Sequence, residues 1–421
     1  MADIIKNIKG TRDIFLNESV IWQYIESYIH SFFQQYGFSE IRTPAFENTN
    51  LFTRSIGNET DIVSKEMYTW IDQGGNNLTL KPEVTASVAR SYIQNNFNKK
   101  HVINKFYYID TLFRRERPQK GRYRQFKQFG VEVLGSTYAE QDAEVIALIY
   151  NFYNSLGIEN LNLKLNSIGS KESRIKYKKA LKDYLTPHKD KLSKVSQGRL
   201  QTNPLRILDT KIDFEIEILK SAPRIIDFIS KDDSDHFNEL LSLLNHLKIK
   251  YVIDYNLVRG LDYYCKTVFE IQSNLLGAQD ALCGGGRYDY LIEELGGKST
   301  PAIGFAAGLE RLILVLENQD DIIKNRSDIY LISLGEDAIK FSFEIAEKLR
   351  KNNLKVIMET LRRSLKSQMK EANKLQVKHV IIIGEEEIKN QKVIIKNMDS
   401  GNQKEISLDQ IDTFSKNKID V

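Results

Sequence analysis

Basic side chains crowd one short segment of the chain. Between positions 114 and 127 a single acid, Glu116, interrupts the series Arg114, Arg115, Arg117, Lys120, Arg122, Arg124 and Lys127. A guanidinium group fixed on a strand holds a phosphate through two parallel hydrogen bonds, with a geometry that a loop lysine lacks. The density of positive charge on this segment therefore indicates phosphate contacts. For Arg115 we favour an exposed surface position.

An amide and a carboxylate follow at strand spacing. If the segment that ends at Leu134 forms a strand, Phe126, Gln128, Gly130, Glu132 and Leu134 share one of its faces. Gly130 would leave space above the sheet, in which Gln128 and Glu132 could hold a small ligand that carries N–H groups. The alternative is a solvated sheet face, because antiparallel sheets often have one wet side.

Two further segments place polar side chains beside glycine. Arg259, Asp262, Tyr263 and Tyr264 surround Gly260, and they could form an ion-paired corner or line a pocket. We expect CGGGRYD at 283–289 to form a glycine-rich turn between a strand and a helix. Such a turn would let the backbone approach a ligand near a helix N-terminus, although it is often only structural. Its spacing fits neither the Rossmann nor the Walker pattern.

The segment IGFAAGLERLILVL at 303–316 begins with small apolar residues and is expected to continue as an apolar helix. Glu310 and Arg311 are charged in these surroundings, so each must be paired or must serve a ligand. The small side chains before them leave room for a flat group.

These residues need elements that hold them in place. Apolar residues at helical spacing predict a helix over 18–36, and alternation predicts a strand within FSEIRTPAFE at 38–47. A second helix is expected to start at Glu83. Two strands around a polar turn at 117–122 predict a hairpin over 105–134, and hence an antiparallel sheet.

The chain is long enough for two or three domains. We expect a first domain over 1–325, which carries a charged, helix-rich insertion at 171–250. Apolar strands that alternate with helices indicate a parallel α/β domain over 326–421. The predicted fold class is therefore α+β with an antiparallel sheet, followed by a smaller α/β domain.

Composition excludes several classes of protein. With 41% hydrophobic and 28% charged residues, the chain is neither disordered nor fibrous. It has no apolar run of about 18 residues and no secretory pattern at its start, so we expect a cytoplasmic protein without a membrane partner. The two cysteines, Cys265 and Cys283, and the six histidines show no ligand spacing, so no structural metal is expected. The net charge of +4 decides nothing by itself.

Five segments, in order, resemble known motifs. TPAFE at 43–47, FRRERPQKGRYRQFKQFGVEVLG at 113–135 and GFAAGLERL at 304–312 are similar to motifs 1, 2 and 3 of the class II aminoacyl-tRNA synthetases. LVRGLDYY at 257–264 and GGGRYD at 284–289 resemble two motifs peculiar to the histidyl members of that family. Residues 362–384 are similar to the family's anticodon-binding domain. Five motifs in the right order are far more specific than any one alone.

The resemblance implies a catalytic sheet of six or seven antiparallel strands, a homodimer formed through motif 1, and a reaction in two steps. Histidine would react with ATP, accompanied by Mg²⁺, to give histidyl-adenylate and pyrophosphate, and would then be transferred to the 3′ end of tRNA(His). The alternative is a non-catalytic, histidine-binding regulatory subunit, but such relatives typically lack the C-terminal domain. A plain RNA-binding module would leave Glu83, Glu132 and Arg311 without purpose.

The same resemblance assigns roles to residues of this chain. Catalysis would fall to Arg259 and Arg114. Histidine would be bound by Glu83, Thr85, Gln128, Glu132, Arg259, Tyr264 and Tyr288. ATP would be bound by Arg114, Glu116 and Arg311, and tRNA by Arg117, Gln119, Lys120, Arg122, Arg362, Arg363 and Lys366. The chain departs from many relatives at Lys81, Val84 and Arg115, where arginine, glycine and histidine are common.

Overall fold

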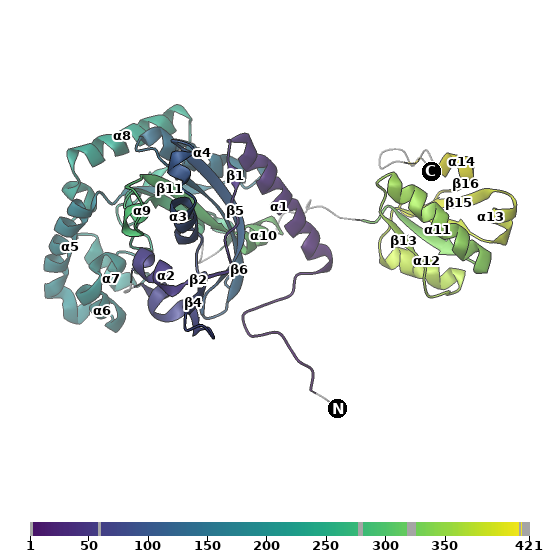
Figure 1. Ribbon diagram of the computed structural model, residues 1–421, viewed down its shortest axis with the longest axis horizontal. Coiled ribbons are helices and arrows are strands. Elements are labelled where there is room, and N and C mark those ends of the chain that lie inside the picture. The colour runs from purple at the N-terminus through teal and green to yellow at the C-terminus, as the bar shows by residue number, and fades with distance from the viewer. Residues whose placement is uncertain (1–2, 58–59, 277–280, 318–325, 412–413, 415–421) are drawn as a thin grey trace. The chain divides into compact units, whose positions relative to one another are not determined.

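The computed structural model describes residues 3–57, 60–276, 281–317, 326–411 and 414. The chain divides into two compact units, Met1–Ile322 and Ile323–Val421, and each is described by itself (Figure 1). Position 325, where we expect the first domain to end, lies outside the described residues. No helix of the described residues is long and apolar enough to cross a lipid bilayer.

An eight-stranded sheet of order β1-β5-β6-β11-β10-β9-β7-β8 forms the centre of the first unit. Its strands are β1 (Ser39–Glu40), β5 (Asn104–Phe113), β6 (Gln125–Leu134), β11 (Ala302–Gly308), β10 (Ala281–Arg287), β9 (Cys265–Gln272), β7 (Asn162–Ser167) and β8 (Val252–Ile253). The inner strands pair antiparallel throughout, as expected. The two-residue strands β1 and β8 pair parallel at the edges, so the described sheet has more strands than the six or seven implied.

Strands β5 and β6 form the hairpin that the sequence predicts. They pair in continuous antiparallel register from Asn104↔Leu134 to Phe113↔Gln125. Side chains of β6 alternate between the two faces of the sheet, so Phe129 and Val131 enter the apolar core while Gln128 faces a cavity on the other side.

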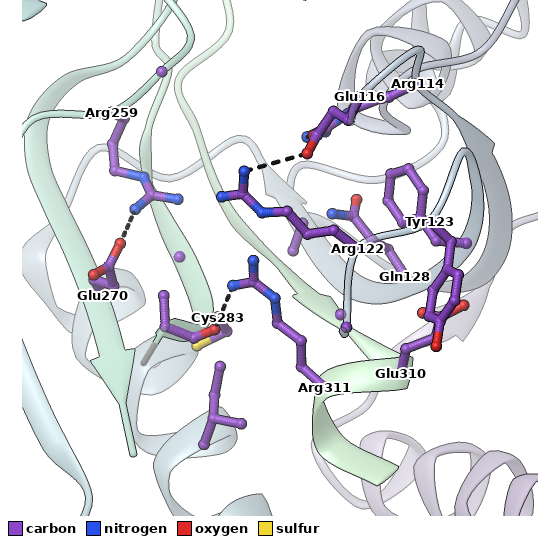
Figure 2. A pocket seen from close by; sticks show the side chains of 18 residues that line it. Arg114, Glu116, Arg122, Tyr123, Gln128, Arg259, Glu270, Cys283, Glu310 and Arg311 are labelled. Carbon is purple, nitrogen blue, oxygen red and sulfur yellow. Dashed lines mark hydrogen bonds and ion pairs between the residues drawn. The ribbon is translucent and has the colours of Figure 1, made fainter. Parts of the chain in front are cut away.

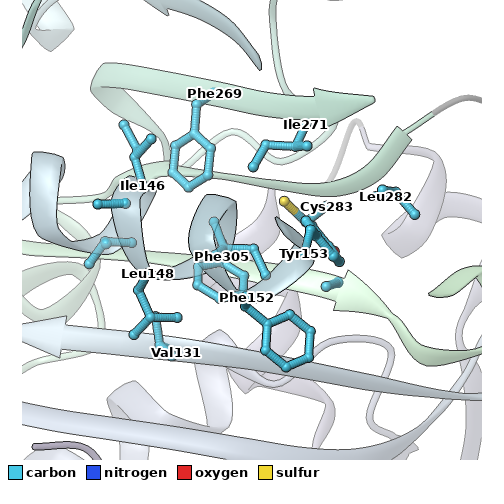
Figure 3. Packing of buried hydrophobic residues seen from close by; sticks show 14 of the residues in the cluster. Val131, Ile146, Leu148, Phe152, Tyr153, Phe269, Ile271, Leu282, Cys283 and Phe305 are labelled. Carbon is cyan, nitrogen blue, oxygen red and sulfur yellow. The ribbon is translucent and has the colours of Figure 1, made fainter. Parts of the chain in front are cut away.

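One face of the sheet is covered by helices that share a single apolar core. They are α1 (Leu16–Gln35), α4 (Ala139–Ser155), α8 (Lys231–His246) and α10 (Leu309–Leu316). Figure 3 shows Ile146 and Phe152 of α4 packed against Val131, Phe269 and Phe305 of the strands. Each fully buried apolar side chain of this kind contributes about 1.5–3 kcal/mol to folding. The core therefore gives the opposite face of the sheet a rigid support.

The segment FSEIRTPAFE forms two short strands in different sheets rather than one strand. Strand β1 joins the large sheet, whereas β2 (Phe46–Asn48) pairs with β4 (Asn77–Leu80) beside β3 (Tyr68–Ile71). Pro44 lies between β1 and β2, where its missing N–H would interrupt a ladder. Helices α2 (Thr49–Ile56), α3 (Thr85–Gln94) and α9 (Leu291–Glu294) contact one another in the same unit.

Helices fill the segment that the sequence marks as charged and helix-rich. They are α5 (Lys171–Leu185), α6 (Lys194–Thr202), α7 (Asp213–Leu219) and α8, and they end at His246. Serine side chains cap three of them: the hydroxyls of Ser170, Ser193 and Ser230 accept from backbone N–H groups in the first turn. Serine at these positions explains where the helices begin.

The second unit is an α/β unit with a five-stranded sheet of order β13-β12-β14-β15-β16. Its strands are β12 (Ile329–Ser333), β13 (Val356–Met358), β14 (His379–Ile383), β15 (Lys392–Asn397) and β16 (Gln403–Ser407), and its helices are α11 (Glu336–Lys351), α12 (Leu365–Lys374), α13 (Glu385–Lys389) and α14 (Leu408–Ile411). The expected parallel pairing is found among β12, β13 and β14, whereas β15 and β16 are added antiparallel. A tight turn joins these two strands, and a turn of that kind reverses the chain.

The prediction of a glycine-rich turn at 283–289 is also wrong. Gly284, Gly285 and Gly286 lie inside strand β10, at the centre of the sheet. A Cβ atom on Gly285 would come within 2.3 Å of the Gly304 carbonyl oxygen and 2.7 Å of the Phe269 ring. These glycines therefore let adjacent strands and side chains approach closely.

We predict that Gly285→Ala lowers the free energy of unfolding by about 1–3 kcal/mol, because the added methyl group overpacks the sheet. Gly198→Ala is the matched control, since a Cβ atom at Gly198 in α6 meets nothing within 4 Å. The control should stabilise the chain by up to about 1 kcal/mol, as alanine does in a helix. Chemical unfolding can be followed by the fluorescence of Trp22 and Trp70, both in the first unit. Equal stability of the two variants would contradict the packing argument.

Candidate active site

A cavity of about 360 Å³ opens on the face of the sheet that the large core does not cover (Figure 2). The hairpin, β9, β10, β11 and the start of α10 line it. Its charged and polar lining residues are Arg114, Glu116, Arg122, Tyr123, Gln128, Arg259, Glu270, Cys283, Glu310 and Arg311. The structure thus brings together segments that are far apart in the sequence and that were singled out for their chemistry.

Four arginine side chains line this cavity, and protein groups hold each of them. Arg114 donates from Nε to the Pro82 carbonyl oxygen at 2.9 Å, and its guanidinium lies 5.3 Å from the centre of the Phe126 ring. Arg311 donates from Nη1 to the Ala281 carbonyl oxygen at 2.7 Å. Burial, and then the charge of nearby Arg122, lower the pKa of Arg311. Positive charge crowded in this way favours an anionic ligand.

Arg259 is held from one side by a carboxylate. Its Nη1 lies 2.6 Å from Oε2 of Glu270, and Glu270 also accepts from Gln272 at 2.8 Å. Nε of Arg259 is buried and has no hydrogen-bond partner. A Cβ atom on Gly284 would come within 2.0 Å of the guanidinium, so glycine at this position makes room for it. The pair therefore orients Arg259 and leaves part of it available to a ligand.

A buried polar cluster, formed by Glu83, Thr85, Glu132 and Tyr288, belongs to the same unit but not to the cavity lining. Glu132 accepts from the hydroxyls of Thr85 at 2.7 Å and Tyr288 at 2.5 Å. Glu83 accepts from the N–H groups of Thr85 and Ala86, both at 2.8 Å, and so caps the first turn of α3. Burial raises the pKa of Glu132 to about 8. This cluster is a preformed set of acceptors and hydroxyls that excludes water.

Aromatic rings complete the cluster. The Tyr263 ring lies 4.7 Å from that of Tyr264 and 5.7 Å from that of Tyr288, measured between centroids, and all three are buried. Asp262, by contrast, accepts from the Asn203 amide at 3.1 Å, and its backbone N–H donates to Ile56 at 3.3 Å. The ion-paired corner is therefore wrong: Asp262 binds an amide, and Arg259 binds Glu270 and lines the cavity. The two tyrosines belong to the buried cluster.

The space expected above Gly130 does not exist. A Cβ atom there would meet the hydroxyl oxygen of Tyr108 at 2.5 Å, because Tyr108 faces Gly130 across the β5–β6 pair. Gln128 therefore lines the cavity, while Glu132 belongs to the buried cluster. The solvated-face alternative is wrong as well, since Glu132 is only 1% exposed.

The sequence left open whether Glu310 is paired within the protein or serves a ligand, and the structure shows a protein partner. Its Oε1 accepts from the backbone N–H of Lys127 at 2.9 Å, and burial raises its pKa to about 7. Glu310 thereby ties the start of α10 to strand β6. Cys283 also lines the cavity, and burial raises the pKa of its thiol to about 12.

Of the residues expected to contact tRNA, only Arg122 also lines the cavity. Arg117, Gln119, Lys120 and Arg122 are exposed on the turn of the hairpin. In the second unit, Arg362 and Lys366 are exposed. Arg363 instead binds the buried Glu359 through Nη2 at 2.7 Å and Glu371 through Nη1 at 3.3 Å. These ion pairs give Arg363 a structural role inside its own unit.

Sequence reasoning did not identify Glu270, Tyr108 or the ion pair between buried Lys81 and half-buried Asp110. A signal for Glu270 existed, because it is the one carboxylate within the segment KTVFEIQ at 266–272. A charge among apolar strand residues needs a partner or a ligand. Among the described residues, no group of acidic, histidine and cysteine side chains could hold a metal ion.

Known proteins resemble the chain over nearly its whole length. A histidyl-tRNA synthetase family model matches residues 10–312, and an anticodon-binding domain model matches residues 328–418. A histidine–tRNA ligase of Thermoanaerobacter sp. (strain X514) is 48% identical over 98% of this chain and 100% of its own length. That of Syntrophotalea carbinolica is 44% identical over 97% of both chains.

Solved structures agree. The crystal structure of apo S. aureus histidyl-tRNA synthetase matches with a TM-score of 0.82 and 38% identity, over 98% of this chain and 100% of that one. A Bacillus halodurans structure described as an ATP phosphoribosyltransferase regulatory subunit/histidyl-tRNA synthetase shares the fold, with a TM-score of 0.66 and 22% identity, over 91% of this chain and 99% of that one. The family models and the full-length relatives identify the catalytic branch: the chain belongs to the histidyl-tRNA synthetase family.

Proposed function

We propose that this chain activates L-histidine with ATP, giving histidyl-adenylate and pyrophosphate, and then transfers histidine to the 3′ end of tRNA(His). One observation carries the proposal: four arginines line a cavity beside a buried cluster of hydrogen-bonding groups. The cavity suits a triphosphate, and the cluster suits a small ligand with N–H donors. Relatives of nearly the same length that bear the name histidine–tRNA ligase support this reading over a regulatory subunit.

In the first step, the carboxylate of histidine attacks the α-phosphorus of ATP, and pyrophosphate leaves. Arg114 and Arg259 reach the reacting phosphate from opposite walls of the cavity, Arg114 from the hairpin and Arg259 from the segment before β9. Arg311 binds the nucleotide from the start of α10, and Glu116 stands beside Arg114 and Arg122. Because protein groups already hold these cations, little reorganisation is needed when negative charge develops on phosphoryl oxygens.

The buried cluster recognises the amino acid. Glu83, Thr85 and Gln128 bind the ammonium end, and Glu132, Tyr264 and Tyr288 surround the imidazole. A side chain that leaves the buried acceptors unpaired is rejected by a factor of about 10⁴ or more. Selectivity of that size makes a separate editing site unnecessary.

In the second step, the terminal ribose hydroxyl of tRNA loses its proton and attacks the carbonyl carbon of the adenylate; an ester bond forms, the acyl–phosphate bond breaks and AMP leaves. The exposed turn residues Arg117, Gln119, Lys120 and Arg122 guide the acceptor end, and Arg362 and Lys366 contact the anticodon arm. Arg363 fits this role less well than its neighbours, because Glu359 and Glu371 neutralise it.

Mg²⁺ accompanies the ATP and neutralises part of the charge on its phosphates. A homodimer forms through the β2–β3 region, where Phe46 and Trp70 are exposed and lie 6.0 Å apart between ring centroids. Exposed aromatic side chains in contact are typical of association surfaces. The enzyme works in the cytoplasm, where its tRNA is used.

The direct test is exchange of labelled pyrophosphate into ATP without tRNA. Exchange should occur with histidine and with no other amino acid. Arg259→Ala should lower it by about a hundredfold or more, because the variant loses a cation aimed at the reacting phosphate. Binding of tRNA should stay unchanged and serves as the control. Histidine binding without exchange in the unmodified chain would favour a regulatory subunit, and near-normal exchange in the variant would remove Arg259 from catalysis.

The raised pKa of Glu132, about 8, predicts how histidine affinity depends on pH. Below pH 8 the empty pocket holds a proton on Glu132 that must be lost before the carboxylate can accept from an imidazole N–H. Histidine should therefore bind more tightly as the pH rises to about 8. In Glu132→Gln this component should vanish, while the titration of free histidine near pH 6.5 remains. Calorimetry from pH 6 to 9 measures the affinity for histidine. Identical pH profiles for the unmodified chain and Glu132→Gln would contradict the prediction.

Lys120, on the exposed turn and outside the cavity lining, should act on tRNA alone. Lys120→Ala should reduce the dependence of log KM for tRNA on log salt by about one unit, because one phosphate contact is lost. Pyrophosphate exchange should be unaffected. Lys99→Ala removes an exposed lysine outside this turn and is the matched control. A change in pyrophosphate exchange, or an equal effect of Lys99→Ala, would count against the assignment.

A further inference from the structure

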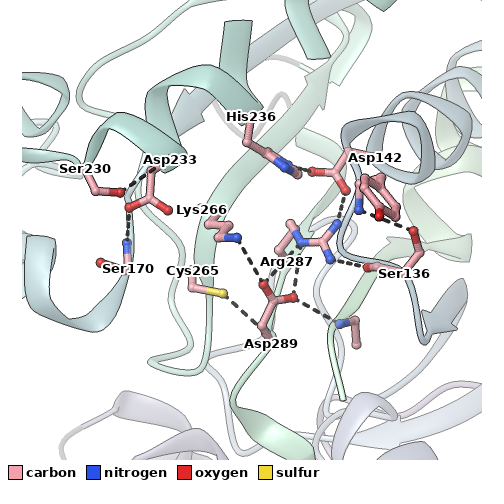
Figure 4. A network of polar contacts seen from close by, with 12 residues as sticks. Ser136, Asp142, Ser170, Ser230, Asp233, His236, Cys265, Lys266, Arg287 and Asp289 are labelled. Atoms are coloured by element: carbon pink, nitrogen blue, oxygen red, sulfur yellow. Dashed lines mark hydrogen bonds and ion pairs between the residues drawn. The ribbon is translucent and has the colours of Figure 1, made fainter. Parts of the chain in front are cut away.

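A buried network of charged side chains joins helices α4 and α8 to the end of strand β10 (Figure 4). Arg287 and Asp142 are both 0% exposed, and Nη1 of Arg287 lies 2.5 Å from Oδ1 of Asp142. The other oxygen of Asp142 lies 2.8 Å from Nε2 of His236 on α8. Asp142 is therefore held by one partner from the sheet and one from the helical insertion.

The same network fixes the backbone on both sides of Tyr288. Arg287 also donates to the Ser136 carbonyl oxygen and, from Nε, to Asp289 at 3.1 Å. Asp289 accepts from the N–H of Ala302 at 3.1 Å, and the N–H of Tyr288 donates to the Ala302 carbonyl oxygen at 2.8 Å. Tyr288 thus stands between two anchored neighbours.

Arg287 and Tyr288 are consecutive, so their side chains leave the extended backbone in opposite directions. That of Arg287 enters the core side, where α4 and α8 lie. That of Tyr288 enters the buried polar cluster and donates to Glu132. A displacement of Asp142 or Arg287 would therefore move the tyrosine hydroxyl that contacts Glu132.

We propose that His236 is a positioning residue for histidine recognition: by holding Asp142 against Arg287, it sets the position of Tyr288 relative to Glu132. The helical insertion is thereby coupled to the amino-acid pocket through the sheet. The inference rests on the proposed role of Tyr288 and Glu132 in binding histidine, and it adds a residue that acts on this pair through Asp142 and Arg287.

Stability alone is a weak explanation of this network. The attraction within a buried ion pair hardly exceeds the solvation energy that the two charges lose. Apolar residues of similar volume often give the same stability. Groups of this kind do fix geometry, because hydrogen bonds to charged partners are short and directional. Tyr288 lies beside the proposed histidine pocket and must be positioned accurately. Holding it there is a function that the network can serve.

The test compares two amides at position 236 in pyrophosphate exchange. The amide nitrogen of glutamine reaches the place of Nε2, whereas that of asparagine reaches only the place of Nδ1. His236→Asn should raise KM for histidine about tenfold, the effect of losing a hydrogen bond to a charged group. KM for ATP and kcat should stay within about twofold, and His236→Gln should restore KM for histidine.

Asp233→Asn is the matched control on α8. Asp233 accepts from the N–H of Ser170 at 3.0 Å and caps the insertion. Asp233→Asn should leave KM for histidine unchanged. If it raises KM for histidine as much as His236→Asn does, the effect is a general loosening of α8 and the proposal is overturned. If His236→Asn does not fold, Arg287→Lys, which retains the charge but loses the fork of donors, carries the same expectation.

Tyr288→Phe separates the proposed role of Tyr288 in binding histidine from the proposed positioning role of His236. If it leaves KM for histidine unchanged, the proposed role of Tyr288 fails. If Tyr288→Phe raises KM for histidine and His236→Asn, stably folded, does not, the positioning role of His236 alone is overturned. A lower melting temperature of His236→Asn with an unchanged KM for histidine would likewise leave only a structural role.

Discussion

Burial of the Glu132 carboxylate is the constraint on which the rest of the site depends. A carboxylate removed from water needs hydrogen bonds, and those of Glu132 come from Thr85 at the start of α3 and Tyr288 after β10. Gly304 on the adjacent strand must lack a side chain, because a Cβ atom there would lie 2.0 Å from Oε2 of Glu132. One buried carboxyl group thus fixes the relative positions of a helix, a strand end and a neighbouring strand.

A second principle separates the arginines of this chain by their surroundings. Arg114, Arg259 and Arg311 line a cavity and are each oriented by a carbonyl or carboxylate group. Arg363 has its fork occupied by Glu359 and Glu371. Residue type alone does not distinguish these cases. An arginine whose guanidinium is held by two carboxylates stabilises the fold. An arginine that is oriented from one side and faces a cavity can bind a ligand.

Much of the fold was predictable from local pattern. The hairpin 105–134, the helix 18–36 and the strand–helix alternation of the C-terminal part follow from spacing that a single segment carries. Other features depended on distant segments: Tyr108 fills the space above Gly130 from the neighbouring strand, and the glycines at 284–286 serve close approach rather than a turn. The site residues came mainly from motif resemblance, and Glu270 was missed because its partner Arg259 lies 11 positions away in a different element.

The glycines at the centre of the sheet also bear on how this protein can evolve. Every other amino acid has a Cβ atom, so each missense change at Gly284, Gly285 or Gly304 places an atom within 2.3 Å of a neighbour. At Gly284 and Gly304 that neighbour is Arg259 or Glu132 itself. A single substitution at any of these positions must therefore displace sheet backbone or a side chain of the site, whereas a Cβ atom at Gly198 in α6 meets nothing within 4 Å.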